Sequence, residues 1–217
     1  MKKVLFFGFF NFCLISCYFG KQIPVELREE LKCYTDSITS ISSRININGF
    51  YSTKKNTTMY FGFKGEGIDT FFYSYSMFFE DGIYLDNFSL SSINESNANL
   101  FYKYQCWGHY IMSGDTIKAK CLAIYPPFSG PPYAYERWYI VLDKNTIKEI
   151  FSKSLDRTLG GKQIYFLKNY VNKENPPATF VPMETIPNSD YCWLKKEKWF
   201  WCNESDWKEY MKKEKKK

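Results

Sequence analysis

The segment Cys106–Ile124 constrains the fold of this chain most strongly, because its pattern is that of a tight β-hairpin. Gly114 and Asp115 form a dipeptide that supplies the positive φ of a short hairpin turn. After the turn, apolar residues and lysines alternate over Ile117–Ala123, which predicts a strand with one buried face. Before the turn, both faces of Cys106–Met112 carry apolar residues. The hairpin therefore predicts the wall of an antiparallel barrel or sandwich.

Further segments along the chain have the same strand character and are separated by turn residues. We expect strands over residues 44–52, 59–63, 70–79, 83–88, 135–142, 146–152 and 163–170, with a turn at 54–58. Together with the central hairpin this gives about eight or nine strands, at the spacing typical of an antiparallel barrel. The sequence predicts an all-β, mainly antiparallel fold: an up-and-down barrel or meander.

Short helices are expected at both ends of this β-rich domain. Pro24 and early acidic residues mark the start of a helix over 24–31, and Ser205 is a candidate cap for a last helix. Residues 172–189 are rich in proline and are expected to be extended coil. Tyr191–Cys202 is close to a palindrome, and we expect a small hairpin there that a bond between Cys192 and Cys202 would clamp.

The amino-terminal residues have the pattern of a secretory signal, with Lys2 and Lys3 followed by a short apolar run. The run is too short for a spanning helix, so residues 1–16 are excluded from the fold. Leu14–Cys17 resembles the lipobox of bacterial lipoproteins, which implies that Cys17 is lipidated on its sulfur and that residues 17–23 form a tether. The alternative is an ordinary signal peptide that is cut nearby, with Cys17 left as a plain thiol.

A single domain is expected over residues 24–210, followed by a basic tail at 211–217. The formal net charge of +6 comes mainly from lysines of the signal and of the tail, so the folded body is close to neutral. A nucleic-acid-binding protein would need a basic face on that body, and we exclude this class. The tail is expected to be solvated; a weak contact with anionic lipid headgroups is the alternative.

Export would allow the cysteines of this chain to form disulfides. Of seven cysteines, Cys13 lies in the signal and Cys17 is assigned to lipid. The remaining odd number leaves at least one thiol unpaired. Besides Cys192 with Cys202, the candidate pair is Cys106 with Cys121. A four-residue hairpin loop places these two opposite each other, whereas a two-residue loop makes them diagonal neighbours that are hard to bridge.

The residues offer little for catalysis. The one histidine, His109, lies in an expected strand, and the chain has no Gly-x-Ser-x-Gly elbow, phosphate loop or Cys-x-x-Cys motif. A structural role for this histidine is favoured over a catalytic one. The carboxylates that a glycosidase would need lie mostly in turns. These carboxylates are Glu66, Asp69, Glu80, Asp81 and Asp86. We expect a protein that is not an enzyme and has no metal or cofactor.

Aromatic residues make up 20% of the chain, which favours binding. The run Phe71–Phe79 is expected to consist of core and sheet-face residues, which strands favour. Candidate ligand or partner contacts lie in or beside expected loops: Tyr125, Tyr133, Trp193 and Trp199. For these four, packing in the core is an equally good interpretation.

Three pieces of the sequence, within about residues 44–152, resemble a known family. The pieces are Asn48–Tyr51, Phe79–Ile83, and Trp107–Tyr110 followed by Gly114–Lys118. They are similar to poorly characterised lipocalin-like lipoproteins of Bacteroidetes, whose barrels run up and down. The resemblance implies a lipocalin-like barrel. It carries over no catalytic residue, and the Trp-rich end from Tyr191 lies outside it. The lipobox resemblance, with Tyr18 after the cysteine, implies an outer-membrane lipoprotein that faces the periplasm.

Two functions are therefore expected. The first is a membrane-anchored envelope lipoprotein with a non-catalytic binding role, for a small hydrophobic ligand or a sugar. The second is a structural or assembly protein that binds another envelope protein through its Trp-rich carboxyl-terminal region. An apolar cavity inside a closed barrel would favour the first, and a filled barrel with exposed aromatic residues would favour the second.

Overall fold

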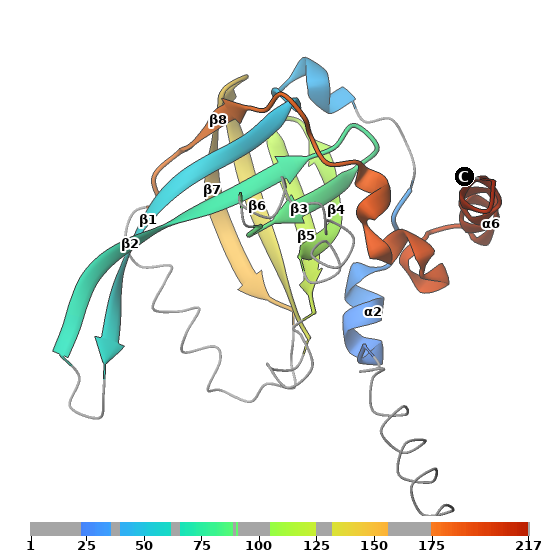
Figure 1. The fold of residues 1–217 in the computed structure, drawn as a ribbon, viewed down its shortest axis with the longest axis horizontal. Helices are drawn as coiled ribbons and strands as arrows, with labels where there is room; N and C mark the ends of the chain where they lie inside the picture. Colours follow the sequence, from blue (N-terminus) through green and yellow to red (C-terminus); the bar gives the residue numbers. More distant parts are fainter. Residues whose placement is uncertain are drawn as a thin grey trace, which may run out of the picture.

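The computed structural model describes residues 23–35, 40–61, 66–88, 90, 105–124, 132–155 and 175–216. Within these ranges, eight strands form a closed antiparallel barrel in which each strand pairs with its neighbours in the sequence and β8 pairs with β1 (Figure 1). The strands are β1 (Gly49–Phe61), β2 (Glu66–Phe78), β3 (Ile83–Asp86), β4 (Cys106–Ser113), β5 (Thr116–Ala123), β6 (Tyr133–Asp143), β7 (Thr146–Ser154) and β8 (Ala178–Pro182). The expected all-β, lipocalin-like up-and-down barrel is confirmed.

Helices flank the barrel at both ends of the described chain, as expected. The α-helices are α2 (Val25–Leu31) and α6 (Glu204–Glu214), and the 3-10 helices are η2 (Ser40–Ser43), η3 (Ser189–Tyr191), η4 (Trp193–Lys196) and η5 (Lys198–Phe200). Helix α6 continues to Glu214, into the segment expected as a basic tail. The expected strand at 163–170 lies outside the described residues.

The central hairpin is confirmed as β4 and β5. Ser113 pairs with Thr116, so the loop contains two residues, and Gly114 takes a φ of +59° in it. Gly108 pairs with Cys121, where a Cβ on the glycine would lie 1.7 Å from the Lys120 carbonyl oxygen. Only a glycine therefore lets the two backbones approach this closely.

The register of this hairpin decides one of the candidate disulfides. Since Gly108 faces Cys121, Cys106 is the diagonal neighbour of Cys121. Both cysteines are buried, free thiols. The geometry is that of the two-residue loop, in which the distance is hard to bridge.

The first hairpin differs from expectation. Residues 49–61 form one strand, β1, instead of a strand, a turn at 54–58 and a second strand. The polar run Lys54–Thr58 stays extended because β2 pairs with it along the whole length, from Tyr51 opposite Ser76 to Phe61 opposite Glu66. β1 and β2 thus form a long two-stranded ribbon whose far part extends beyond the other strands, at the lower left of Figure 1.

Side chains gather in two hydrophobic cores. The barrel core lies inside the sheet and is built from inward-facing residues: Tyr51, Phe78, Tyr84, Cys106, Tyr110, Ile117, Ala119, Cys121, Tyr135, Tyr139 and Ile147, with Ile41 and Ile45 at one end. The outer core lies between the outer face of the barrel and the helices. Its main members are Leu27, Leu31, Tyr34, Met77, Ile83, Leu85, Trp107, Leu122, Leu194, Phe200 and Trp201. The central strand β4 is covered on both faces over Cys106–Tyr110, whereas Ile111 on its outer face is 58% exposed.

The carboxyl-terminal region corrects two expectations. Tyr191–Cys202 is a series of 3-10 turns, η3 to η5, and not a hairpin. Leu194, Phe200 and Trp201 are buried in the outer core, and Trp193 and Trp199 pack against it. In the proline-rich stretch, Ala178–Pro182 is the strand β8 that closes the barrel, because Gly49–Ser52 offers its free edge there.

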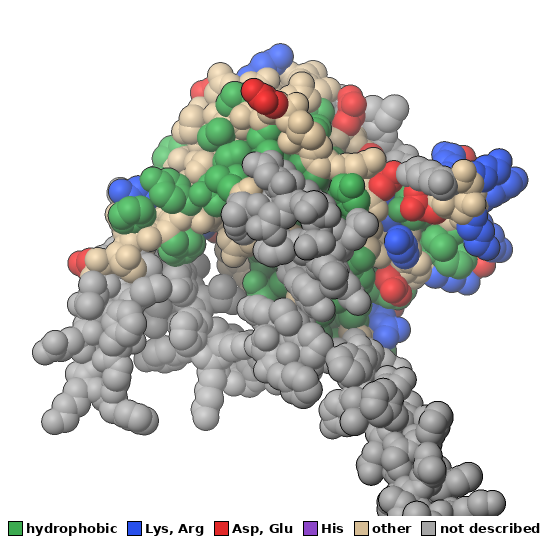
Figure 2. Space-filling view, in the orientation of Figure 1, with side chains coloured by type: hydrophobic (Ala, Val, Ile, Leu, Met, Phe, Trp, Pro, Cys, Tyr) green, Lys and Arg blue, Asp and Glu red, His purple; other side chains and the backbone are tan. Residues whose placement is uncertain are grey.

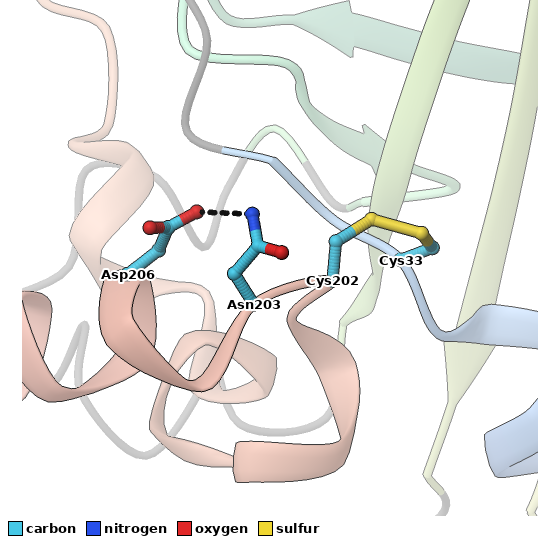
Figure 3. The surroundings of a disulfide bond; sticks show 4 residues. All are labelled: Cys33, Cys202, Asn203 and Asp206. Atoms are coloured by element: carbon cyan, nitrogen blue, oxygen red, sulfur yellow. Dashed lines mark hydrogen bonds between the residues drawn. A yellow bond between two sulfur atoms is a disulfide. The ribbon is translucent and has the colours of Figure 1, made fainter.

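The expected Cys192–Cys202 disulfide is wrong, because Cys202 is bonded to Cys33 (Figure 3). Tyr34 and Trp201 form a parallel bridge in which the Tyr34 amide donates to the Phe200 carbonyl. This pairing places the chain after α2 beside the chain before α6. Cys192 remains a buried free thiol.

Candidate functional site

The barrel encloses a cluster of polar side chains around Asp86. This carboxylate at the end of β3 is 0% exposed. Ser76 and Tyr84 donate hydrogen bonds to its Oδ1 at 2.9 and 2.7 Å, and Tyr135 donates to its Oδ2. Arg137 Nη1 lies 3.0 Å from Oδ2. The buried charge is therefore both paired and hydrogen-bonded, as burial requires.

Strand alternation brings these side chains together. Ser76 pairs with Asp86 across β2 and β3, so both point to the same face of the sheet. From β6, Tyr135, Arg137 and Tyr139 point inward at every second position. The Tyr139 hydroxyl lies 2.7 Å from that of Tyr84.

The electrostatics of the cluster keep its hydroxyl groups protonated. Burial, and next the negative charge of Asp86, raise the pKa of Tyr84 and of Tyr135 well above its ordinary value. Burial alone would lower the pKa of the Arg137 guanidinium, but the adjacent Asp86 raises it. The tyrosines therefore act as hydrogen-bond donors, and the arginine stays charged.

A second ion pair continues the cluster toward the barrel wall. Lys55 Nζ on β1 lies 2.8 Å from Glu149 Oε2 on β7, and Glu149 Oε2 lies 4.0 Å from Arg137. β8 pairs with β1 only over Gly49–Ser52 and with β7 only at two residues. The ion pair thus connects β1 to β7 beyond the end of β8.

The space left inside the barrel beside these side chains is small. The cavity there has a volume of about 10 Å³, which is at the lower limit for one water molecule. Its lining is mainly polar and includes Thr53, Lys55, Ser74, Ser76, Arg137 and Glu149. A fatty-acid-sized ligand has no room at this point of the described barrel.

His109 lies outside the barrel, on the outward face of β4. Burial and the positive charge of Lys120 lower the pKa of its ring to about 4, so the ring is neutral at pH 7. One ring nitrogen is hydrogen-bonded to the backbone of Leu31, whereas Nε2 is buried without a partner. The adjacent pocket of about 210 Å³ has no carboxylate in its lining, which is Cys33, Tyr34, Thr35, Gly82, His109, Tyr110, Ile111 and Met112.

The candidate contact residues do not form one site. Tyr133 packs against the barrel core, with its ring 5.7 Å from that of Tyr135. Trp193 and Trp199 are half-buried against the outer core, on the other side of the sheet. Tyr125 and Cys17 lie outside the described residues.

A row of aromatic side chains on the outer face of β2 is half exposed at one end, at Phe71 and Tyr73, and buried at the other, at Phe88. We call Phe71, Tyr73, Tyr75 and the adjacent Phe88 the aromatic stripe. Phe71 is 53% and Tyr73 is 49% exposed, whereas Met77, Phe78 and Phe79 further along the strand are buried as expected. In Figure 2, hydrophobic side chains gather over β1 and β2 on this face. The run Phe71–Phe79 therefore contains sheet-face residues at its start and core residues at its end, but the sequence did not show that the first of them are exposed.

Ring contacts run along the stripe. The centroids of Phe71 and Tyr73 are 5.9 Å apart, those of Tyr73 and Tyr75 are 6.3 Å apart, and those of Tyr75 and Phe88 are 5.7 Å apart. The planes of Tyr73 and Tyr75 differ by only 4°, but Phe71 stands edge-on at 85° to Tyr73. Lys54 Nζ lies 3.9 Å above the Phe71 ring.

Comparisons of the chain with protein-family models, with curated proteins and with solved structures found no match. Within the described ranges, no group of three or more histidine, cysteine or acidic residues is arranged to hold a metal ion. In the same ranges, no helix has the length and hydrophobicity needed to cross a bilayer.

Proposed function

We propose that this protein is a membrane-tethered, non-catalytic binding module in which the barrel is a scaffold and the aromatic stripe is the binding surface. One observation carries the proposal. The barrel interior at Asp86 and Arg137 is filled by polar side chains around a cavity of about 10 Å³, while Phe71 and Tyr73 are half exposed on the outside. Exposed aromatic clusters of this kind mark interaction sites.

The tether in this proposal rests on the lipobox resemblance at Leu14–Cys17. The apolar run before Cys17 supports the same interpretation, because it ends where a signal peptide would be cut. An acylated cysteine inserts its chains into a bilayer at about 0.8 kcal/mol per buried CH₂, which is enough for stable attachment when several chains are present. The domain would then work beside the envelope membrane.

A non-catalytic role is supported by how the polar groups are used. Ser76, Tyr84, Tyr135 and Arg137 occupy both oxygens of Asp86, which leaves this carboxylate poorly placed to exchange protons with a substrate. The pocket beside His109 contains no carboxylate to orient the ring. A general base needs such access and orientation.

The Trp-rich carboxyl-terminal region is less suited to be the binding surface. Trp201 is buried, and the Trp199 and Trp193 rings pack against the outer core. The proposal therefore moves the contact from this region to the aromatic stripe.

Site-specific photo-cross-linking in the native membrane tests the proposal. A photo-reactive amino acid is introduced in place of Tyr73 and, as the matched control, in place of Leu142, which is 52% exposed on β6. We expect adducts, to lipid or to protein, from position 73 and few or none from position 142. Equal yields from both positions, or none from either, would overturn the assignment of the stripe.

Carbohydrate binding is a second candidate, favoured by the parallel Tyr73 and Tyr75 rings. Sugar rings stack on such faces through their C–H groups. The edge-on Phe71 ring interrupts a flat platform, so we rank this candidate second. Saturable quenching of tyrosine fluorescence by soluble oligosaccharides, lost in Tyr73→Ala, would favour it over the membrane-side contact.

A further inference from the structure

We propose that the aromatic stripe lies against the lipid surface of the same membrane to which Cys17 is tethered. This inference rests on the proposed function and names the partner of its binding surface. It is argued from the position of the tether, the length of chain that reaches it, and the chemistry of the stripe.

The start of α2, which follows the tether in the sequence, and the far part of the ribbon lie at the same end of the barrel (Figure 1). β1 begins at Gly49 and runs to Phe61. Its start lies close to the β6–β7 turn, because the Asn46 amide donates a hydrogen bond to the Lys144 carbonyl. Beyond the carboxyl end of α2, the Tyr34 hydroxyl bonds the Asp81 carbonyl next to the β2–β3 turn. The start of α2 and the tip of the ribbon therefore both lie at the lower end in Figure 1.

The chain that joins this end to the membrane is short. The described domain begins at Ile23, and only residues 18–22 separate it from Cys17. Six residue steps span at most about 22 Å even when fully extended. A lipid on Cys17 would therefore hold the start of α2 close to the bilayer surface, within reach of a ribbon that extends to the same side.

The chemistry of the stripe fits a lipid interface better than open water. Phe71 and Tyr73 combine large apolar rings with a phenol hydroxyl, and such side chains are enriched at the headgroup level of membranes. Lys54, above the Phe71 ring, offers an ammonium group to a headgroup phosphate. Asp69, two residues before Phe71, offsets this charge, so the contact should depend on the rings and only weakly on anionic lipid or salt.

The limited pairing of the ribbon with other described strands also supports a contact with the membrane. Among the described strands, β1 pairs with β8 only over Gly49–Ser52, and β2 pairs with β3 only over Ser76–Phe78. No other described strand therefore pairs with the part of the ribbon that carries Phe71 and Tyr73. Isolated two-stranded ribbons are marginal in water, and a surface that receives their apolar face stabilises them.

The test uses the full, lipidated protein in phosphatidylcholine vesicles, with and without bromine on the acyl chains near the headgroup. Phe71→Trp adds one indole at an exposed site on the ribbon. Leu142→Trp adds one at an equally exposed site beside the β6–β7 turn, at the other end of the barrel. Bromine quenches tryptophan on contact. We expect the fluorescence added by Phe71→Trp to be quenched at least about twofold more than that added by Leu142→Trp, with little change in 0.5 M salt.

The outcomes separate the inference from the proposed function. If the wild-type protein carries no acyl chain and does not sediment with vesicles, the proposed function fails, and the inference with it. If the protein sediments but the two variants are quenched equally, only the inference is overturned. A third outcome is that Phe71→Trp is not quenched, the protein is dimeric by sedimentation, and Tyr73→Ser is monomeric. The stripe would then bind a second copy of the chain, and the inference would also be overturned.

Discussion

Asp86 and Arg137 meet inside the barrel, with Nη1 of the arginine 3.0 Å from Oδ2 of the aspartate. Asp86 comes from β3 and Arg137 from β6, and both side chains point into the barrel. Three tyrosine hydroxyls and Ser76 surround the pair, and the Lys55–Glu149 ion pair extends it to the wall. The barrel interior thus contains a charged and hydroxyl-rich cluster beside its aromatic core, whereas Phe71 and Tyr73 are half exposed on the outer face, where we propose that binding occurs.

Replacement of Asp86 should be strongly destabilising. In Asp86→Asn the buried Arg137 charge loses its nearest counter-ion and keeps only Glu149 at 4.0 Å, and we expect the free energy of unfolding to fall by about 3–5 kcal/mol. Urea denaturation monitored by circular dichroism measures the loss. Glu184→Gln, which changes an exposed carboxylate, is the control and should change stability by less than about 0.5 kcal/mol. A comparable effect in the two variants would mean that the ion pair does not hold the barrel together.

Loss of the Cys33–Cys202 disulfide should also lower stability. The bond closes a loop with a sequence separation of 169 residues, so its removal is expected to cost about 2–5 kcal/mol. Reductant should lower the melting temperature of the wild type and of Cys192→Ala, but not that of Cys33→Ala. A Cys192→Ala protein that is indifferent to reductant would instead implicate Cys192 in the bond.

Two glycines of the central hairpin should respond differently to alanine. At Gly108 the new Cβ would meet the Lys120 carbonyl and the Cys121 backbone, so Gly108→Ala must separate β4 from β5. We expect a loss of about 3 kcal/mol or more, or failure to fold. At Gly114 the Cβ meets open space and only the positive φ opposes it, so Gly114→Ala should cost about 1 kcal/mol. Thermal unfolding of both variants measures the difference, and equal losses would contradict the register.

Stability should fall between pH 6.5 and pH 4 because of His109. Burial and Lys120 lower its pKa from 6.5 to about 4 in the folded protein, so the unfolded chain binds a proton in this range and the folded chain does not. The stabilisation is complete above pH 6.5 and is lost as the pH falls toward 4, by up to about 3 kcal/mol. Denaturation at pH 7 and at pH 5 should give a smaller difference for His109→Gln than for the wild type. An unchanged difference would mean that another group titrates.

The sequence predicted the strands whose ends carry their own signals. β4 and β5 flank Gly114, and β6 and β7 flank the turn at Lys144, so local turn chemistry and a period of two were enough. The continuity of β1 through residues 54–58 and the whole of β8 were missed, because pairing with partner strands determines both. The polar residues at 54–58 stay extended only because they pair with β2. β8 pairs with β1 and β7, although the proline content of its surroundings had predicted coil.

The functional surface was only partly predictable, for a related reason. A run such as Phe71–Phe79 shows that a strand is aromatic but not which face is inside. Ser74 and Ser76 alternate with Tyr73 and Tyr75, and the serines point into the polar cluster inside the barrel. On the assumption of a wholly apolar interior, the tyrosines would have been placed inside instead. The Cys33–Cys202 bond joins segments that no local pattern connects.

The central claim is that a tethered barrel with a filled interior binds on its outside. Native mass spectrometry of the full protein, released from its membrane in mild detergent, tests the claim most directly. The account predicts the mass of the chain from Cys17 with acyl groups, one disulfide, and no small molecule retained inside. A protein without acyl groups, or one that retains a small molecule at one per chain, would contradict it.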